Sequence, residues 1–133
     1  MKLTVRSEYA LLALIYLARC DSRELVSAGS IAKAQGIPLK FLEQILLALK
    51  RARYLKSSKG QHGGFSLARP AREITIAEIV RLFDGALAPT ESVSRYFYHP
   101  TPIEKEKKMT RLFKDIRDFV ARKLENTTLE DIL

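Results

Sequence analysis

The sequence predicts a mainly α-helical fold with one small β-hairpin, and three observations support that prediction. Apolar residues recur at helical spacing over most of the 133 residues. Capping and stop signals bound these segments, and a glycine-bearing turn within residues 54–69 joins two short strands. The length suits a single domain, and 47% of the residues are apolar, so we expect one modest core.

The first predicted helix covers residues 7–20. Ser7 is its expected N-cap, and Glu8 complements the helix dipole in the first turn. Both sides of this helix carry apolar residues, so we expect it to be buried on most sides. One apolar face is expected to follow positions 9, 12, 13, 16, 17 and 20.

Two further helices are predicted on either side of a glycine. Ser27 can cap a short helix over residues 28–35, which Gly36 would end. Pro38 suits the first turn of the next helix, predicted over residues 38–53, because its missing N–H costs nothing there. The inner face of that helix is expected to hold Leu42, Ile45, Leu46 and Leu49.

The middle of the chain predicts a hairpin followed by a helix. Strands are expected over residues 54–59 and 65–69, joined by a turn that contains three glycines. Thr75 and Glu78 then form a capping box that opens a helix. Ile74 and Ile79 are expected to form a hydrophobic staple at its start. The helix is predicted to run to Asp84, and Gly85 is expected to end it.

The C-terminal part predicts a loop and a long helix. Residues 86–102 show no clear period, whereas an amphipathic helix is predicted over residues 103–124. Thr127 and Glu130 form a capping box before a short last helix. The chain therefore divides into residues 1–85, 86–102 and 103–133. The long helix carries an apolar stripe of Met109, Leu112, Phe113, Ile116, Phe119, Val120 and Leu124.

The net charge of +8 is concentrated in one window, residues 33–72. This window holds nine basic residues and a single acidic one, Glu43, whereas the rest of the chain carries equal numbers of both signs. Because each neutralised phosphate releases counterions, such a window predicts a surface that binds a polyanion. A solvated basic face without a partner is the alternative that charge alone leaves open.

The order of helix, short helix, turn, helix and hairpin is typical of a winged helix-turn-helix, with residues 27–68 as its DNA-reading unit. An α-helix fits the major groove, where exposed side chains reach base edges. Lys40 and Gln44 are expected to face outward together, since lysine suits guanine and glutamine suits adenine. Phe41 either contacts a thymine methyl group or packs within the domain.

The hairpin is expected to lie against DNA as the wing. Lys56, Lys59 and His62 would sit beside phosphates or in an adjacent minor groove, on a turn that Gly60 and its neighbours permit. A glycine-rich loop can also hold nucleotide phosphates. That alternative is disfavoured because no lysine-serine pair follows the glycines and a strand, not a helix, comes next.

Four stretches of the chain, in order, follow the pattern of one known family. They are SEYALLAL from Ser7, GIPLKFLEQIL from Gly36, KGQHGGFSLARP from Lys59 and TTLEDIL from Thr127. On these stretches the chain resembles the Rrf2 family of transcriptional regulators. The resemblance implies a homodimer in which the helix from about residue 103 crosses its twin. The residues expected at the dimer contact are Met109, Leu112, Phe113, Ile116, Phe119 and Val120.

The resemblance also implies positions that contact DNA, among them Lys40, Phe41, Gln44 and Lys59. Glu43, the one acid of the basic window, either accepts from a cytosine amino group, disfavours other bases or orients a neighbouring lysine. The full set expected to contact DNA is Ser27, Lys33, Leu39, Lys40, Phe41, Glu43, Gln44, Lys50, Arg51, Lys56, Lys59, Gly60 and His62.

Many members of the family hold an iron–sulfur cluster through three cysteines in the loop before the dimerisation helix. This chain has no cysteine there, and hydroxyl groups are poor substitutes for thiolates, so we expect no cofactor and no metal. The single cysteine, Cys20, is expected to be a small buried apolar residue. The loop residues Tyr96, Phe97 and Tyr98, with His99, either fill the space of a cluster or bind a small effector.

These features together predict a sequence-specific DNA-binding regulator, a homodimeric repressor that reads a near-palindromic site in double-stranded DNA. An interaction module of the same fold, controlled by a partner enzyme or metabolite, is the alternative. An enzyme is not expected, because no nucleophile, base and orienting group occur at a recognisable spacing. The longest apolar stretch has ten residues, too short for a membrane span, and a single cysteine fits the cytoplasm.

Overall fold

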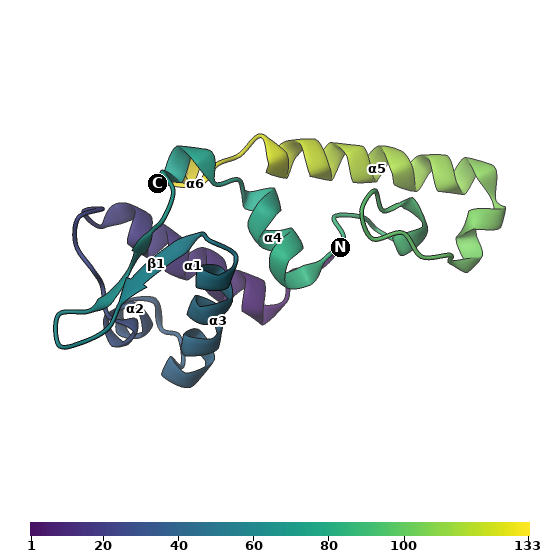
Figure 1. Cartoon of the computed structure of the whole chain (residues 1–133). Coiled ribbons are helices and arrows are strands. Elements are labelled where there is room, and N and C mark those ends of the chain that lie inside the picture. Colours follow the sequence, from purple (N-terminus) through teal and green to yellow (C-terminus); the bar gives the residue numbers. More distant parts are fainter.

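A computed structural model describes all 133 residues and contains six α-helices and one two-stranded antiparallel sheet. The mainly helical prediction with a single hairpin is therefore confirmed. In Figure 1, α5 runs along one side of the molecule, and α2, α3 and the hairpin lie on the opposite side. The elements are α1 (Val5–Arg19), α2 (Ala28–Gln35), α3 (Leu39–Arg51), β1 (Leu55–Ser58), β2 (Gly64–Leu67), α4 (Ile76–Asp84), α5 (Lys107–Glu125) and α6 (Leu129–Ile132), with 3-10 turns at Ala71–Glu73, Glu91–Val93 and Pro102–Lys105.

The core lies where α1 packs against α2, α3, α4 and α6. The expected inner face of α3 is confirmed, because its four apolar residues at helical spacing are all fully buried. The expected face of α1 is only partly correct. Ala13 and Leu17 of that face are buried, but Leu12 is 37% exposed, whereas Ala10 and Leu14 outside it are fully buried. Apolar residues surround α1, so spacing alone could not identify the side that its neighbours cover.

Ser7 does not cap α1, which begins two residues earlier than predicted. Thr4 is the N-cap, and its hydroxyl accepts from the Ser7 N–H. The Ser7 side chain is fully buried and donates to Asp84 Oδ2 at 2.6 Å, while Thr4 also donates to Asp84. The carboxylate at the end of α4 thus holds the start of α1, where the helix dipole also favours a negative charge.

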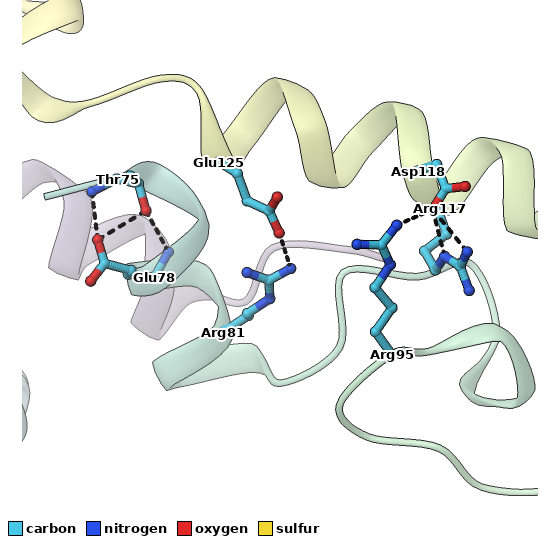
Figure 2. Close-up of polar contacts among 7 residues, drawn as sticks. All are labelled: Thr75, Glu78, Arg81, Arg95, Arg117, Asp118 and Glu125. Atoms are coloured by element: carbon cyan, nitrogen blue, oxygen red, sulfur yellow. Dashed lines mark hydrogen bonds and ion pairs between the residues drawn. The ribbon is translucent and has the colours of Figure 1, made fainter.

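The helix α4 joins the first part of the chain to α5. Its predicted capping box is present: Thr75 Oγ1 accepts from the Glu78 N–H, and the Thr75 N–H donates to Glu78 Oε2 at 2.8 Å. One turn later, Arg81 Nη2 lies 2.7 Å from Glu125 Oε1 of α5 (Figure 2). This nine-residue helix is therefore capped at its start and ion-paired to the long helix near its end.

The last helices differ from the prediction at their starts. Residues Pro102–Lys105 form a separate 3-10 turn, so α5 begins at Lys107 instead of residue 103. The final capping box uses Thr128 and Asp131, one residue later than expected. Leu129 of α6 is fully buried in the core, and its N–H donates to the Ile74 carbonyl at 2.9 Å. The short last helix thus packs against α1 and the 3-10 turn Ala71–Glu73.

No helix of the structure combines the length and the apolar character that crossing a bilayer requires.

Candidate nucleic-acid interface

The turn between α2 and α3 sets the direction of the helix predicted to read DNA. Ser27 caps α2 as expected, and its hydroxyl accepts from the Ser30 N–H at 3.1 Å. Gly36 ends α2 in the left-handed region, with φ 66° and ψ 36°. Pro38, predicted in the first turn of this helix, is instead the N-cap of α3, which begins one residue later, at Leu39. Because Ile37 between them is buried, the turn is anchored to the core and α3 has a defined orientation.

The polar side chains on the outer face of α3 have no partner within the chain. The side chains of Lys40, Glu43 and Gln44 are exposed and make no hydrogen bond or ion pair. Leu39 is 44% exposed beside them at the start of the helix. A helix with one fully buried stripe and one unpaired polar face is suited to enter the major groove with that face.

Phe41 combines the two roles that its sequence position left open. Its ring lies edge-on to Tyr9 of α1, with centroids 5.5 Å apart and an interplanar angle of 81°. It is nevertheless 37% exposed. The contact with Tyr9 orients the ring, and the exposed edge remains available for an apolar contact such as a thymine methyl group.

The hairpin is fastened to the segment that leads into α2. Val26 and Phe65 exchange two backbone hydrogen bonds, at 2.9 and 2.8 Å, beside the β1–β2 pairing. Gly64 has φ 153°, and a Cβ there would lie 2.6 Å from the Val26 backbone, so only glycine allows this approach. The hairpin therefore has a fixed base, from which its tip projects (Figure 1). The exposed residues of the hairpin include Lys56, Lys59, Gly60 and His62.

The basic window splits into unpaired and paired cations. Eight of its cations are exposed and form no ion pair. One of them, Arg72, lies in the 3-10 turn after β2, and the other seven are Lys33, Lys40, Lys50, Arg51, Arg53, Lys56 and Lys59. Arg69 is different, because its Cζ lies 4.2 Å from the centroid of the Tyr54 ring and its Nη2 lies 3.5 Å from Glu78 Oε1. The positive field therefore arises on α2, α3 and the hairpin, where counterion release would favour a polyanion.

Arg53 is a residue of this surface that the sequence-based set omits. The prediction carried α3 to residue 53, but the helix ends at Arg51. Arg53 follows in the left-handed region with φ 68°, and its N–H donates to the Lys50 carbonyl while the Tyr54 N–H donates to the Leu49 carbonyl. This is the Schellman ending of a helix, usually made with glycine, and the sequence has no glycine here to signal it.

The loop before α5 is folded, and its aromatic residues point outward. Ser92, Val93 and Ser94 are buried, and the Val93 carbonyl accepts from Arg117 of α5 at 2.7 Å. The side chains expected to fill an interior space do not do so, since the exposed fractions of Tyr96, Phe97 and Tyr98 are 68%, 46% and 55%. Short polar residues supply the buried side of this loop, so the aromatic rings remain at the surface of the single chain.

Tyr98 and His99, two of the residues predicted to bind an effector, each face a carboxylate close to them in the sequence. Tyr98 donates to Glu104 Oε1 at 2.6 Å, and this hydrogen bond raises the pKa of the Tyr98 phenol. The His99 ring lies 3.9 Å from the Glu91 carboxylate, with both side chains largely exposed. Arg95 of the loop pairs with Asp118 of α5 (Figure 2). Arg81 of α4 lies over the Tyr96 ring, and Arg117 of α5 donates to the Val93 carbonyl. The loop thus lies at the surface and is held to α4 and α5 by three arginine side chains.

The face of α5 turned away from α4 carries exposed apolar side chains. The exposed fractions of Met109, Leu112, Ile116 and Phe119 are 42%, 49%, 39% and 68%. Phe113 and Val120 on the same stripe are half-buried. An apolar stripe of this size is unusual on the surface of a soluble monomer and is typical of a protein contact.

Comparison with known proteins gives a consistent result along the whole chain. A family model described as Rrf2, iron-dependent transcriptional regulator, matches residues 3–133. A protein of Mycobacterium tuberculosis named among the HTH-type transcriptional regulators is 36% identical over 135 residues, covering 99% of this chain and 81% of the relative. The regulator IscR of Cereibacter sphaeroides is 31% identical over 135 residues, covering all of this chain and 87% of IscR. Among solved structures, CymR, the global cysteine regulator of Bacillus subtilis, superposes with a TM-score of 0.79 at 31% identity, covering 99% of this chain and 95% of CymR.

The residues of this chain do not fit the iron that the family description names. Cys20 is the single cysteine, and it lies at the end of α1 with its thiol donating to the Tyr16 carbonyl at 3.2 Å. No three histidine, cysteine or acidic side chains gather anywhere in the chain as metal ligands would. Thiolate donors, which iron–sulfur clusters require, are missing from the loop of residues 86–102. The loop of this chain therefore lacks the donors that would hold a cluster.

Proposed function

Because this chain belongs to the Rrf2 family of DNA-binding transcriptional regulators, we propose that it binds a near-palindromic operator as a homodimer and represses transcription. The observation that carries the proposal is the coincidence of seven unpaired cations with the exposed outer face of α3 and the adjoining hairpin. Such a surface attracts the phosphate backbone and presents side chains to base edges at the same time.

The side chains on α3 have the role of base readers in this proposal. Lys40 and Gln44 are four residues apart on the outer face and can donate to guanine and pair with adenine, respectively. Glu43 lies between them and can accept from a cytosine amino group while it repels phosphate. Phe41, oriented by Tyr9, would contact a thymine methyl group.

The remaining predicted contacts position the protein on DNA. Lys56, Lys59 and His62 of the hairpin would lie along the backbone or in the neighbouring minor groove, where Gly60 permits close approach. Ser27 and Lys33 would contact phosphates from α2, whereas Lys50 and Arg51, with Arg53, would do so from the end of α3. Contacts of this kind add affinity for any sequence.

The dimer would form through the apolar stripe of α5. Burial of four side chains that are 39% to 68% exposed favours association with a second copy by the hydrophobic effect. A two-fold dimer presents two copies of α3, and these would have to lie about 34 Å apart to enter successive major grooves on one side of the duplex. Occupancy of a promoter in the cytoplasm would then exclude the polymerase.

Tyr96, Tyr98 and His99 are the residues that we propose contact an effector. Their exposure, on a loop braced by three arginines, gives a small molecule or protein a rigid aromatic surface to bind. This effector contact is tested by replacing Tyr96 and Tyr98 with alanine. Loss of the effector response with unchanged stability and DNA affinity is expected, and an unchanged response would remove this role.

The assigned reading roles are tested by Gln44→Ala and Lys59→Ala, with Lys108→Ala on α5 as the control. Lys59→Ala should weaken binding to every duplex and reduce the slope of log affinity against log salt by about 1. Gln44→Ala should instead lower discrimination at one base position, at a cost of about 1–3 kcal/mol for the preferred operator. Selection of bound genomic fragments supplies the operator, and fluorescence anisotropy at several salt concentrations measures the affinities.

Equal effects of Gln44→Ala on operator and random duplexes would contradict its role as a base reader. Little binding to any duplex and a shallow salt slope for the unmodified protein would favour the alternative, an interaction module in which the basic surface is secondary. In vitro transcription from the selected operator decides the sign of regulation, since a repressor lowers the yield of transcript.

A further inference from the structure

Leu47 is an exposed apolar residue of α3 that is absent from the set expected to contact DNA. Its side chain is 44% exposed, although the same helix buries four other apolar side chains completely. The core therefore does not explain why a leucine is present at this position.

The spacing along α3 places Leu47 on the side opposite the core. Four exposed residues recur at intervals of four, three and four positions: Lys40, Gln44, Leu47 and Arg51. A helix with about 3.6 residues per turn places such residues on one side. Leu47 lies about 150° around the helix axis from the centre of the buried stripe. It thus belongs to the outer face that carries the unpaired polar side chains.

The neighbours of Leu47 on this face have proposed roles in DNA binding, and the inference rests on that proposed function. Gln44 precedes it by three positions and would pair with adenine, whereas Arg51 follows it by four positions and would contact a phosphate. A side chain between these two lies in the major groove when both contacts are made. In Figure 1, α3 lies across the molecule from α5, so Leu47 is not part of the apolar stripe proposed for the dimer.

An apolar side chain has one suitable partner on the floor of the major groove. The edges of the base pairs carry hydrogen-bond donors and acceptors there, and the C5-methyl of thymine is the apolar group among them. A donor or acceptor covered by leucine would lose water without gaining a partner, which is unfavourable. We propose that Leu47 is a specificity-determining residue that packs against a thymine methyl group of the operator.

Leu47 and Phe41 would contact different bases. Leu47 follows Phe41 by six positions, which is about 9 Å along the helix axis and about 120° around it. Leu47 lies about 4.5 Å beyond Gln44 along the axis, and one base-pair step is about 3.4 Å. The thymine that Leu47 contacts should therefore lie one or two base pairs from the adenine that Gln44 reads.

The contact is tested by replacing each thymine of the selected operator with uracil, which differs from thymine only in lacking the methyl group. Uracil at the position facing Leu47 should weaken binding of the unmodified protein about fourfold in one half-site and about fifteenfold in both. Leu47→Ala should bind the thymine operator with a loss at least as large. At that position it should lose less than about twofold more with uracil, because the methyl group has lost its partner. Fluorescence anisotropy measures the affinities.

Cytosine and 5-methylcytosine at the same position measure the methyl contact independently. These two bases differ only in the C5-methyl group, so the unmodified protein should bind the 5-methylcytosine duplex about fourfold more tightly per half-site. Leu47→Ala should not distinguish the two duplexes. Equal binding of both by the unmodified protein would contradict the methyl contact.

Two further variants serve as controls for Leu47→Ala. Leu82→Ala is the matched control, because Leu82 is 41% exposed on α4, outside the proposed reading face. It should leave the operator affinity and the effect of uracil unchanged. Phe41→Ala should remove the effect of uracil at a different position only. Light scattering should give Leu47→Ala the same mass as the unmodified protein.

The outcomes separate this inference from the proposed function. An effect of uracil that persists in Leu47→Ala at every position, or an operator affinity that this variant keeps in full, would overturn the inference alone. An equal loss of affinity for operator and random duplexes, or a changed mass, would also overturn it, since Leu47 would then act on the fold or on a contact with another protein. Selection of no preferred sequence by the unmodified protein would refute the proposed function, and this inference with it.

Discussion

Arg53 is the only residue other than glycine with a positive φ, a backbone conformation that is strained for a residue with a Cβ. Glycine adopts the same backbone angles without a clash between Cβ and the carbonyl. Arg53→Gly should therefore raise the free energy of unfolding by about 0.5–1 kcal/mol, measured by urea denaturation. Arg51→Gly removes the same charge within α3 and should lower it by a similar amount. Destabilisation by both variants would contradict the account of the helix ending.

Glu78 links the start of α4 to the hairpin, and its protonation should weaken that link. Burial raises the pKa of its carboxyl, but hydrogen bonds from Thr75 and Tyr54 and the charge of Arg69 lower it by more, so the net pKa lies below the ordinary 4.5. The resulting stabilisation is present above the ordinary value and is lost as the pH falls through the lowered pKa of the folded state.

The test of this linkage compares the unmodified protein with Glu78→Gln by urea denaturation between about pH 7 and pH 3. The unmodified protein should be the more stable at neutral pH, and the difference should narrow below 4.5. Glu73→Gln, an exposed neighbour without a side-chain partner, should show no such narrowing. A difference that stays constant across this range would show that the charge of Glu78 contributes nothing.

At the scale of elements, the turn between α2 and α3 depends on Gly36. Its φ of 66° is strained for any residue with a Cβ, although no neighbouring atom lies within 4 Å. Gly36→Ala should lower the free energy of unfolding by about 1 kcal/mol. Gly29→Ala, in the first turn of α2, meets nothing closer than 4.0 Å and should be neutral or raise stability by about 0.5 kcal/mol.

Thermal and urea unfolding of both glycine variants separate strain from crowding. Because space is available around Gly36, a cost there reflects the backbone alone, and an asparagine in its place should recover part of the loss. Equal stability of Gly36→Ala and Gly29→Ala would mean that the turn can relax. The orientation of α3 would then have to depend on the burial of Ile37.

At the scale of the whole molecule, the apolar stripe of α5 should decide the oligomeric state. Phe119 is 68% exposed in the single chain, so Phe119→Glu should leave the fold intact and convert a dimer into monomers. Lys114→Glu is the control, because it introduces the same side chain at an exposed position that helical spacing puts on the opposite side of α5. It should leave the dimer unchanged. Light scattering coupled to size-exclusion chromatography measures the mass.

The monomeric variant should also bind an operator more weakly, because the two copies of α3 no longer bind as a linked pair. Circular dichroism confirms that the variant is folded. A monomer for the unmodified protein, or an unchanged dimer for Phe119→Glu, would exclude this stripe as the contact.

The sequence by itself determined the features that depend on neighbouring residues. The capping box of Thr75 and Glu78, the left-handed ending at Gly36 and the buried stripe of α3 all follow from atoms within about one helical turn. All thirteen residues expected to contact DNA are exposed, because a helix with one apolar stripe leaves only one side for solvent.

Only the tertiary structure decided the features that join distant segments. Ser7, predicted to cap α1, donates to Asp84 instead. The rings of Tyr96, Phe97 and Tyr98, predicted either to fill the space of a cluster or to bind an effector, lie at the surface. Apolar residues all round α1 do not reveal which neighbours cover it. The hollow between residues 17–24 and residues 66–72 joins segments more than forty positions apart. No local pattern predicts it, since it arises from the packing of α1 against the hairpin.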